Sequence, residues 1–101
     1  MLPILSLGGL GVISVLSNIV PNQVHNMVHS YLDGKHLASL SAQLEMLPLI
    51  KLLFSEVNPI PVKCALAMMG YSGCMPRLPL VEMTGGNKEN LRQEMLKFGI
   101  I

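Results

Sequence analysis

The segment EVNPIPVK, residues 56–63, places a lysine directly after two prolines. A lysine amine can form a Schiff base with a carbonyl compound when its pKa is lowered from about 10.4 towards about 7–8. Burial or a neighbouring cation produces such a shift, but Lys63 falls in the first turns of a predicted helix, where neither is indicated. We therefore expect Lys63 to be structural, with Glu56 as a candidate ion-pair partner.

His25 and His29 are four residues apart, the spacing of two metal ligands on one face of a helix. The zinc-protease motif has a glutamate between its two histidines, and this segment has none. No third ligand is apparent in the sequence either. We therefore expect a solvated or interfacial pair, and we predict no metal site and no cofactor.

The two cysteines, Cys64 and Cys74, are too few and too far apart for a disulfide framework or a zinc ribbon. We expect free, packed thiols in a reducing compartment. The glycine-rich GGLG of residues 8–11 precedes a predicted strand instead of following one and opening a helix. It therefore indicates a turn and not a phosphate-binding loop.

A chain of 101 residues forms one domain at most, and half of its residues are hydrophobic, without any tryptophan. So much aliphatic surface on a short chain indicates a partner surface or a missing remainder of the same protein. The net charge is only +1 and no basic stripe is present, which argues against nucleic-acid binding.

The first 20 residues, MLPILSLGGLGVISVLSNIV, carry no formal charge and have about the length of a membrane span. No lysine or arginine flanks them, and three glycines and Pro3 interrupt them, which disfavours a signal peptide or an anchor. The alternative is a buried strand with neighbouring turns. The short β-branched run Gly11–Val15 fits a parallel strand that is covered on both faces.

Helical patterns follow this strand to the end of the chain. One helix is predicted from about Pro21 to Gly34, with its apolar face at i, i+3, i+4 and i+7. A longer, leucine-rich helix should begin at Leu37, and Pro48 should kink or split it. A third is expected from Asn58 as its N-cap, and a fourth carries the apolar residues Leu91, Met95 and Phe98.

The segments GVISVLSNIVP, NPIPVK, RLPL and LKFGII occur in the same order and at similar spacing in the dihydrodipicolinate synthase family. The whole chain resembles the C-terminal third of these 4-hydroxy-tetrahydrodipicolinate synthases. The resemblance implies an α/β fold of which this chain, itself mostly α, is the last part. Residues 1–34 would be the end of a (β/α)8 barrel (the end of helix 7, strand 8 and helix 8), and residues 35–101 a C-terminal helical domain.

The resemblance also implies a cytoplasmic, homotetrameric lyase that condenses pyruvate with aspartate semialdehyde through a Schiff base. The catalytic lysine and tyrosines of the family lie on earlier strands, which this chain lacks, so no catalytic residue is expected in it. One position of the pyruvate site carries over, namely Ile13 at the end of the eighth strand. We expect the chain alone to be inactive, with the rest of the barrel or further copies as its partners.

Two other classes of function stay open from the residues alone. The chain could be a non-catalytic helical interaction module that is stable only on a partner. It could also be a small membrane-anchored helical protein. Neither alternative explains NPIPVK and RLPL at their spacing, and we therefore favour the enzyme fragment, without membrane or nucleic-acid binding.

Overall fold

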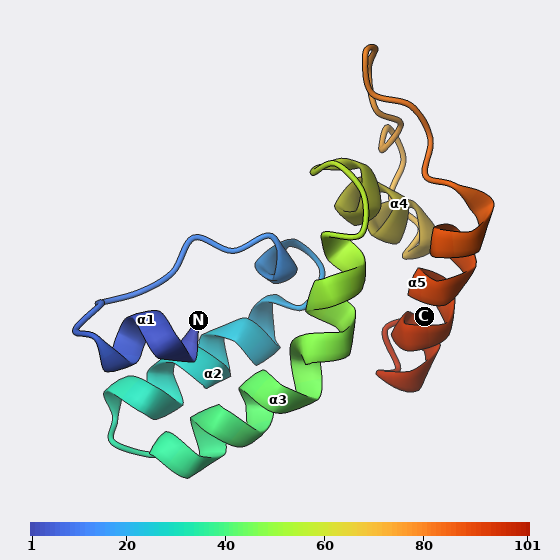
Figure 1. Ribbon diagram of the computed structural model, residues 1–101. Helices are drawn as coiled ribbons and strands as arrows, with labels where there is room; N and C mark the ends of the chain where they lie inside the picture. The colour runs from blue at the N-terminus through green and yellow to red at the C-terminus, as the bar shows by residue number, and fades with distance from the viewer. The chain divides into compact units, whose positions relative to one another are not determined.

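The structure is a computed structural model that describes residues 1–101, and its regular elements are all helical. They are α1 (Leu2–Ser6), the 3-10 turn η1 (Leu16–Asn18), α2 (Pro21–Leu32), α3 (His36–Leu53), α4 (Ile60–Met68) and α5 (Gly85–Lys97), as Figure 1 shows. The chain forms two compact units, Met1–Leu47 and Pro48–Ile101. Helix α3 begins in the first unit and ends in the second.

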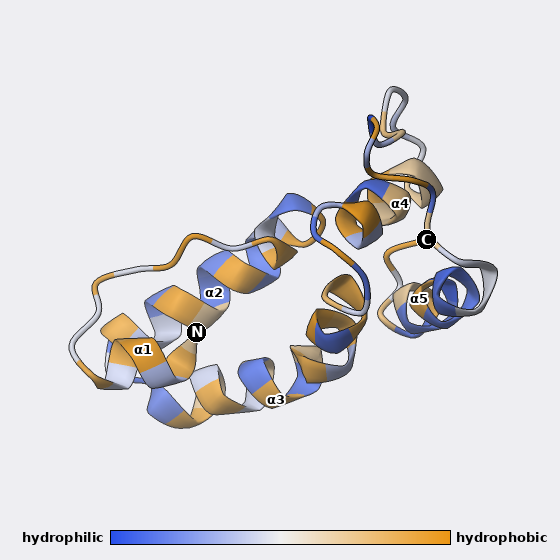
Figure 2. Cartoon of the chain, turned by 45° about the horizontal axis from the view of Figure 1, so that its top comes forward, coloured by the Kyte–Doolittle hydropathy of each residue, from blue (hydrophilic) through white to orange (hydrophobic).

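The strand predicted over Gly11–Val15 is wrong for this chain, because residues 9–14 have no regular structure. No backbone amide or carbonyl of residues 10–14 is hydrogen-bonded to another part of the backbone. A strand exists only through the ladder that it forms with a neighbour, and this chain supplies no second strand. The segment is therefore an open connection, coloured largely hydrophobic in Figure 2.

The first unit is built around α2, against which both α1 and η1 pack. The predicted apolar face of α2 is confirmed, since Val24, Met27 and Val28 are buried. Ser39 of α3 is completely buried, and its hydroxyl donates a hydrogen bond of 2.8 Å to the carbonyl oxygen of Met27. This bond ties the start of α3 to α2.

Helix α2 ends at the predicted glycine. Gly34 has φ +85°, the amide of Lys35 donates to the carbonyl of Ser30, and the amide of Gly34 donates to that of Tyr31. This pair of bonds is the Schellman arrangement, which requires a left-handed residue that glycine adopts without strain. Gly8, with φ +100°, ends α1 in the same way, so the prediction that GGLG is a turn is confirmed.

Helix α3 differs from its prediction in two respects. It runs through Pro48 as one helix, so the predicted split does not occur; one proline removes a single backbone bond from an 18-residue helix. The leucines that indicated the helix, Leu37, Leu40 and Leu44, are exposed. The buried side chains of α3 are instead Ser39, Met46, Leu49 and Leu53.

The second unit packs α4 against α5. Its buried side chains come from the end of α3, from α4, from the connection and from α5: Leu49, Leu53, Ile60, Pro61, Val62, Ala65, Met83, Leu91 and Met95. Helix α4 begins one residue later than predicted. Its N-cap is Pro59 and not Asn58, and it makes no side-chain capping bond.

The carboxylate of Glu56 holds the N-terminus of α5. It accepts hydrogen bonds from the amide of Thr84 at 3.1 Å, from the Thr84 hydroxyl at 2.8 Å and from Nδ2 of Asn87 at 2.9 Å. The bonds from the Asn87 and Thr84 side chains lower the pKa of Glu56 below its usual value. A carboxylate at a helix N-terminus also interacts favourably with the helix dipole.

Candidate functional site

Ile13 is the one substrate-binding residue predicted from the sequence, and its side chain is fully exposed in the structure. It lies in the open segment of residues 9–14, where the side chain of Leu10 is also 89% exposed. A residue in this state cannot form the wall of a binding site by itself. A pocket that includes Ile13 would need side chains from outside this segment.

Part of the same segment covers an open groove of about 370 Å³ beside α2. The groove is lined by residues before α2 and by residues of α2: Leu10, Gly11, Val12, Ser17, Pro21, Val24, His25, Val28, His29 and Leu32. Sequence reasoning did not predict the groove, because it depends on where an irregular segment passes over a helix. The spacing of His25 and His29 was the only signal for it.

Lys63 sits in the first turn of α4, half-buried, where its backbone amide donates to the carbonyl of Pro59. No ion pair forms between Lys63 and a carboxylate, and the suggested pairing with Glu56 is wrong. Glu56 is instead bonded to Thr84 and Asn87, 28 and 31 residues further along the chain. Nothing around Lys63 resembles the acid–base environment that a Schiff-base lysine needs.

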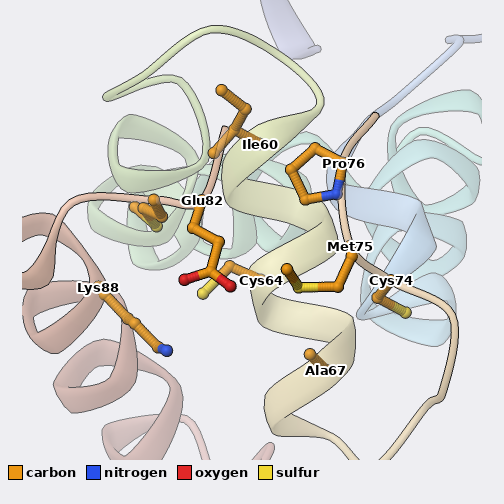
Figure 3. A pocket seen from close by; sticks show the side chains of 9 residues that line it. Ile60, Cys64, Ala67, Cys74, Met75, Pro76, Glu82 and Lys88 are labelled. Carbon is orange, nitrogen blue, oxygen red and sulfur yellow. The ribbon is translucent and has the colours of Figure 1, made fainter. Parts of the chain in front are cut away.

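A second cavity, of about 80 Å³, lies between α4 and the connection that precedes α5 (Figure 3). Cys64, Cys74, Met75, Glu82 and Lys88 are among its lining residues. The cavity has room for two or three water molecules, since a water occupies about 30 Å³.

The Cys64 thiol is the group in this second cavity whose pKa is shifted. Burial raises the pKa of the Cys64 thiol; the Lys88 ammonium opposes this shift, and Glu56 and Glu82 add to it. Both cysteines are free, and Figure 3 shows their sulfur atoms on opposite sides of Met75. Cys64 is thus disfavoured as a thiolate, the form in which cysteine acts as a nucleophile.

The described side chains do not assemble a catalytic set. No group of three or more His, Cys, Asp or Glu residues is arranged to hold a metal ion. None of the helices has both the length and the apolar character that crossing a membrane requires. Within the second unit, Lys63 makes no ion pair and Cys64 and Cys74 are free thiols.

The chain is similar to one family of enzymes along nearly all of its length. Residues 1–97 match the model of the dihydrodipicolinate synthetase family. The 4-hydroxy-tetrahydrodipicolinate synthase of Lachnoclostridium phytofermentans is 54% identical over 99 residues, which are 98% of this chain and 34% of that enzyme. The chain spans about a third of the length of the curated relatives that it matches.

Solved structures agree with this assignment. The dihydrodipicolinate synthase of Thermotoga maritima superimposes with a TM-score of 0.96 at 40% identity, over 99% of this chain and 34% of that one. The synthase of Acinetobacter baumannii, solved in complex with pyruvate, gives a TM-score of 0.90 at 33% identity, over 99% and 34% of the two chains. Mostly helical as it is, the chain therefore has the backbone course of about one third of such an enzyme.

Proposed function

The chain belongs to the dihydrodipicolinate synthetase family, and we propose that it forms the C-terminal third of a 4-hydroxy-tetrahydrodipicolinate synthase of lysine (diaminopimelate) biosynthesis. The match of residues 1–97 is the observation that carries the proposal. The open segment of residues 9–14 supports it, since that segment has the composition of a buried strand but no neighbours. In the complete enzyme, this segment would be a barrel strand and would pair with the strands on either side of it.

The proposed reaction of the complete enzyme is the condensation of pyruvate with aspartate semialdehyde. Pyruvate, bound to a lysine as a Schiff base, would be the nucleophile after loss of a proton. The pyruvate complex of the Acinetobacter baumannii relative supports this choice of substrate. Lys63 does not take the place of that catalytic lysine, and no tyrosine beside it could act as a proton relay.

We assign the chain two architectural parts. Residues 1–34 would contribute the last strand and helix of the barrel, and residues 35–101 the helical C-terminal domain. Ile13, at the end of that strand, would form part of the apolar wall beside pyruvate. Its full exposure in this chain is consistent with a side chain whose contacts come from elsewhere in the enzyme.

The intact enzyme is proposed to be a cytoplasmic homo-oligomer, with a tetramer as the expected state. Exposed apolar residues at the N-terminal end, Ile4 and Leu7, support a contact with another subunit or with the rest of the barrel. They are 58% and 85% exposed, which is unfavourable for two neighbouring aliphatic side chains in water.

The test of the proposal has two arms. The chain alone, incubated with labelled pyruvate and borohydride, should show no labelled lysine and no synthase activity, because nucleophile and relay act as a unit. The same chain should restore activity when it is co-expressed with the Lachnoclostridium phytofermentans synthase from which the matching third has been removed. A labelled Lys63 in the first arm would overturn the assignment.

Ile13 is tested in the restored assembly. Replacing Ile13 with Ala should lower kcat/KM for pyruvate by about tenfold, the usual effect of losing apolar wall contacts. Ile13→Val is the matched control and should change it less than threefold. An Ile13→Ala assembly with unchanged kcat/KM would remove Ile13 from the pyruvate site without affecting the family assignment.

A further inference from the structure

The two histidines of α2 stand together on its exposed surface. Their ring centroids are 4.1 Å apart and their ring planes differ by 29°. Both residues are exposed, and both line the groove of about 370 Å³ beside α2. The groove contains no carboxylate and no ammonium group, so imidazole nitrogens are its principal ligands for a metal.

We propose that His25 and His29 form a two-histidine clamp for a borderline divalent cation of the class Ni²⁺, Zn²⁺ or Cu²⁺. Imidazole is a preferred ligand of these ions, whereas Mg²⁺ and Ca²⁺ require oxygen ligands. Residues i and i+4 of a helix project from the same face, one turn apart. The sequence alone favoured a solvated pair; in the structure the two exposed side chains also lie together at an open groove, where both can reach one ligand.

Chelation by both rings fixes the distance between their coordinating nitrogens. Two metal–nitrogen bonds of about 2.0–2.1 Å at a tetrahedral angle hold the nitrogens about 3.4 Å apart. The two ring centroids are 4.1 Å apart in a stacked arrangement. Because both side chains are exposed, each ring can turn out of the stack so that one nitrogen of each points to a shared ion. The cation would replace a stack of two polar rings by two coordinate bonds from side chains that are already on the same face.

The rest of α2 keeps the two histidines in place. Val24, Met27 and Val28 of the same helix are buried in the core of the first unit and anchor it there. The Schellman bonds at Gly34 close the helix five residues after His29. A rigid backbone of this kind reduces the conformational entropy that is lost when both rings bind the same ion.

The site would be open and exchangeable. With no third His, Cys, Asp or Glu at hand, the remaining coordination positions go to water or to a small ligand from solution. The groove leaves space for them on the side of Leu10 and Val12. Such a site differs from a structural zinc site, which has four protein ligands and no open position.

The test uses the complete 101-residue chain, expressed without a histidine tag, and Ni²⁺ as the probe in calorimetry at pH 7.5. The wild-type chain should bind one equivalent. His25→Ala and His29→Ala should each weaken binding by about tenfold or more, because a chelating second ligand acts at a high effective concentration. His36→Ala is the matched control and should leave the affinity within about twofold, since His36 stacks on Tyr31 instead.

Far-ultraviolet circular dichroism of each variant establishes that α2 is retained, and a second readout locates the ion directly. Diamagnetic Zn²⁺ added to the Cys64→Ser, Cys74→Ser chain should shift the NMR signals of the His25 and His29 rings together, leaving those of His36 in place. Absence of binding by the wild-type chain would overturn the proposal. So would wild-type affinity in His25→Ala, or a shift confined to His36.

Discussion

The two units of the chain differ in how completely their elements pack together and their backbone groups are hydrogen-bonded. In residues 48–101, α4 packs on α5 and Glu56 binds the first turn of α5. In residues 1–47, α1 and η1 pack on α2, but the backbone of residues 10–14 makes no hydrogen bond to any other part of the backbone. Residues 48–101, called the closed unit below, thus pack on one another, whereas residues 9–14 of the first unit form an open segment.

This difference follows from the kind of secondary structure that each part uses. A helix forms its hydrogen bonds within itself, so it persists when its neighbours are removed. A strand takes its bonds from adjacent strands, so its structure disappears with them. The chain follows this rule: its regular elements are all helical, and its strand-like segment, residues 10–14, has no backbone hydrogen bond.

The largest effect is expected in the closed unit. Leu91 on α5 is completely buried, and Leu91→Ala removes three methylene-sized groups from the contact with α4. Burial of this kind predicts a loss of about 2–5 kcal/mol in the free energy of unfolding. Urea titration of the purified chain measures it; a loss below about 1 kcal/mol would show that the α4–α5 contact is loose.

A smaller effect is expected from the buried hydroxyl of the first unit. Ser39→Ala removes the 2.8 Å bond to the Met27 carbonyl and should lower the free energy of unfolding by about 1 kcal/mol. Ser41→Ala, on the exposed side of the same helix, is the control and should change it by less than about 0.5 kcal/mol. Equal effects of the two substitutions would contradict the tie between α2 and α3.

Glu56 gives the closed unit a dependence on pH. Its pKa is lowered in the folded chain, so it contributes stability above its unfolded value of about 4.5, and this contribution is lost as the pH falls through the folded pKa. Glu56→Gln should therefore lower the Tm at pH 7, and the difference from the wild type should shrink below about pH 4. Glu45→Gln, an exposed residue of α3 without a partner, should have no such profile.

The smallest effect on stability is expected in the open segment, where the change should appear in association. Leu10→Asp alters a side chain that is 89% exposed, so the Tm should shift by no more than a degree or two. Sedimentation at micromolar concentration should show that the wild-type chain self-associates through its uncovered apolar segment and that Leu10→Asp reduces this. A wild-type chain that sediments as a compact monomer would contradict the expected dependence on partners.

Much of the helical structure was predictable from local signals. Helices α2 and α5 have a regular apolar face, and Gly34 ends α2 where the sequence indicated. The strand predicted over Gly11–Val15 does not form, because the segment has the composition of a strand but the structure offers no other strand to pair with it. The same limit explains α3, where the repeated leucines indicated a helix but not which of its faces would be buried.

The site was less predictable than the fold. Sequence proximity suggested Lys63 as the partner of Glu56, seven residues away, whereas the structure brings Thr84 and Asn87 to it from much further along the chain. Hydrogen bonds between distant segments depend on packing, which no local pattern encodes. Ile13 came from the resemblance to the family alone, and no property of an isoleucine in a short apolar run would have singled it out.

Hydrogen exchange resolved by residue is the most direct test of the claim that residues 9–14 are a strand without its neighbours. In the isolated chain, at a concentration where it is monomeric, the amides of residues 10–14 should exchange at unprotected rates, while those of α5 around Leu91 should be protected. In the full-length synthase of Thermotoga maritima, the aligned segment should be strongly protected. Strong protection of residues 10–14 in the monomeric chain would show that the segment has partners of its own, and the account of this chain as an incomplete barrel would be wrong.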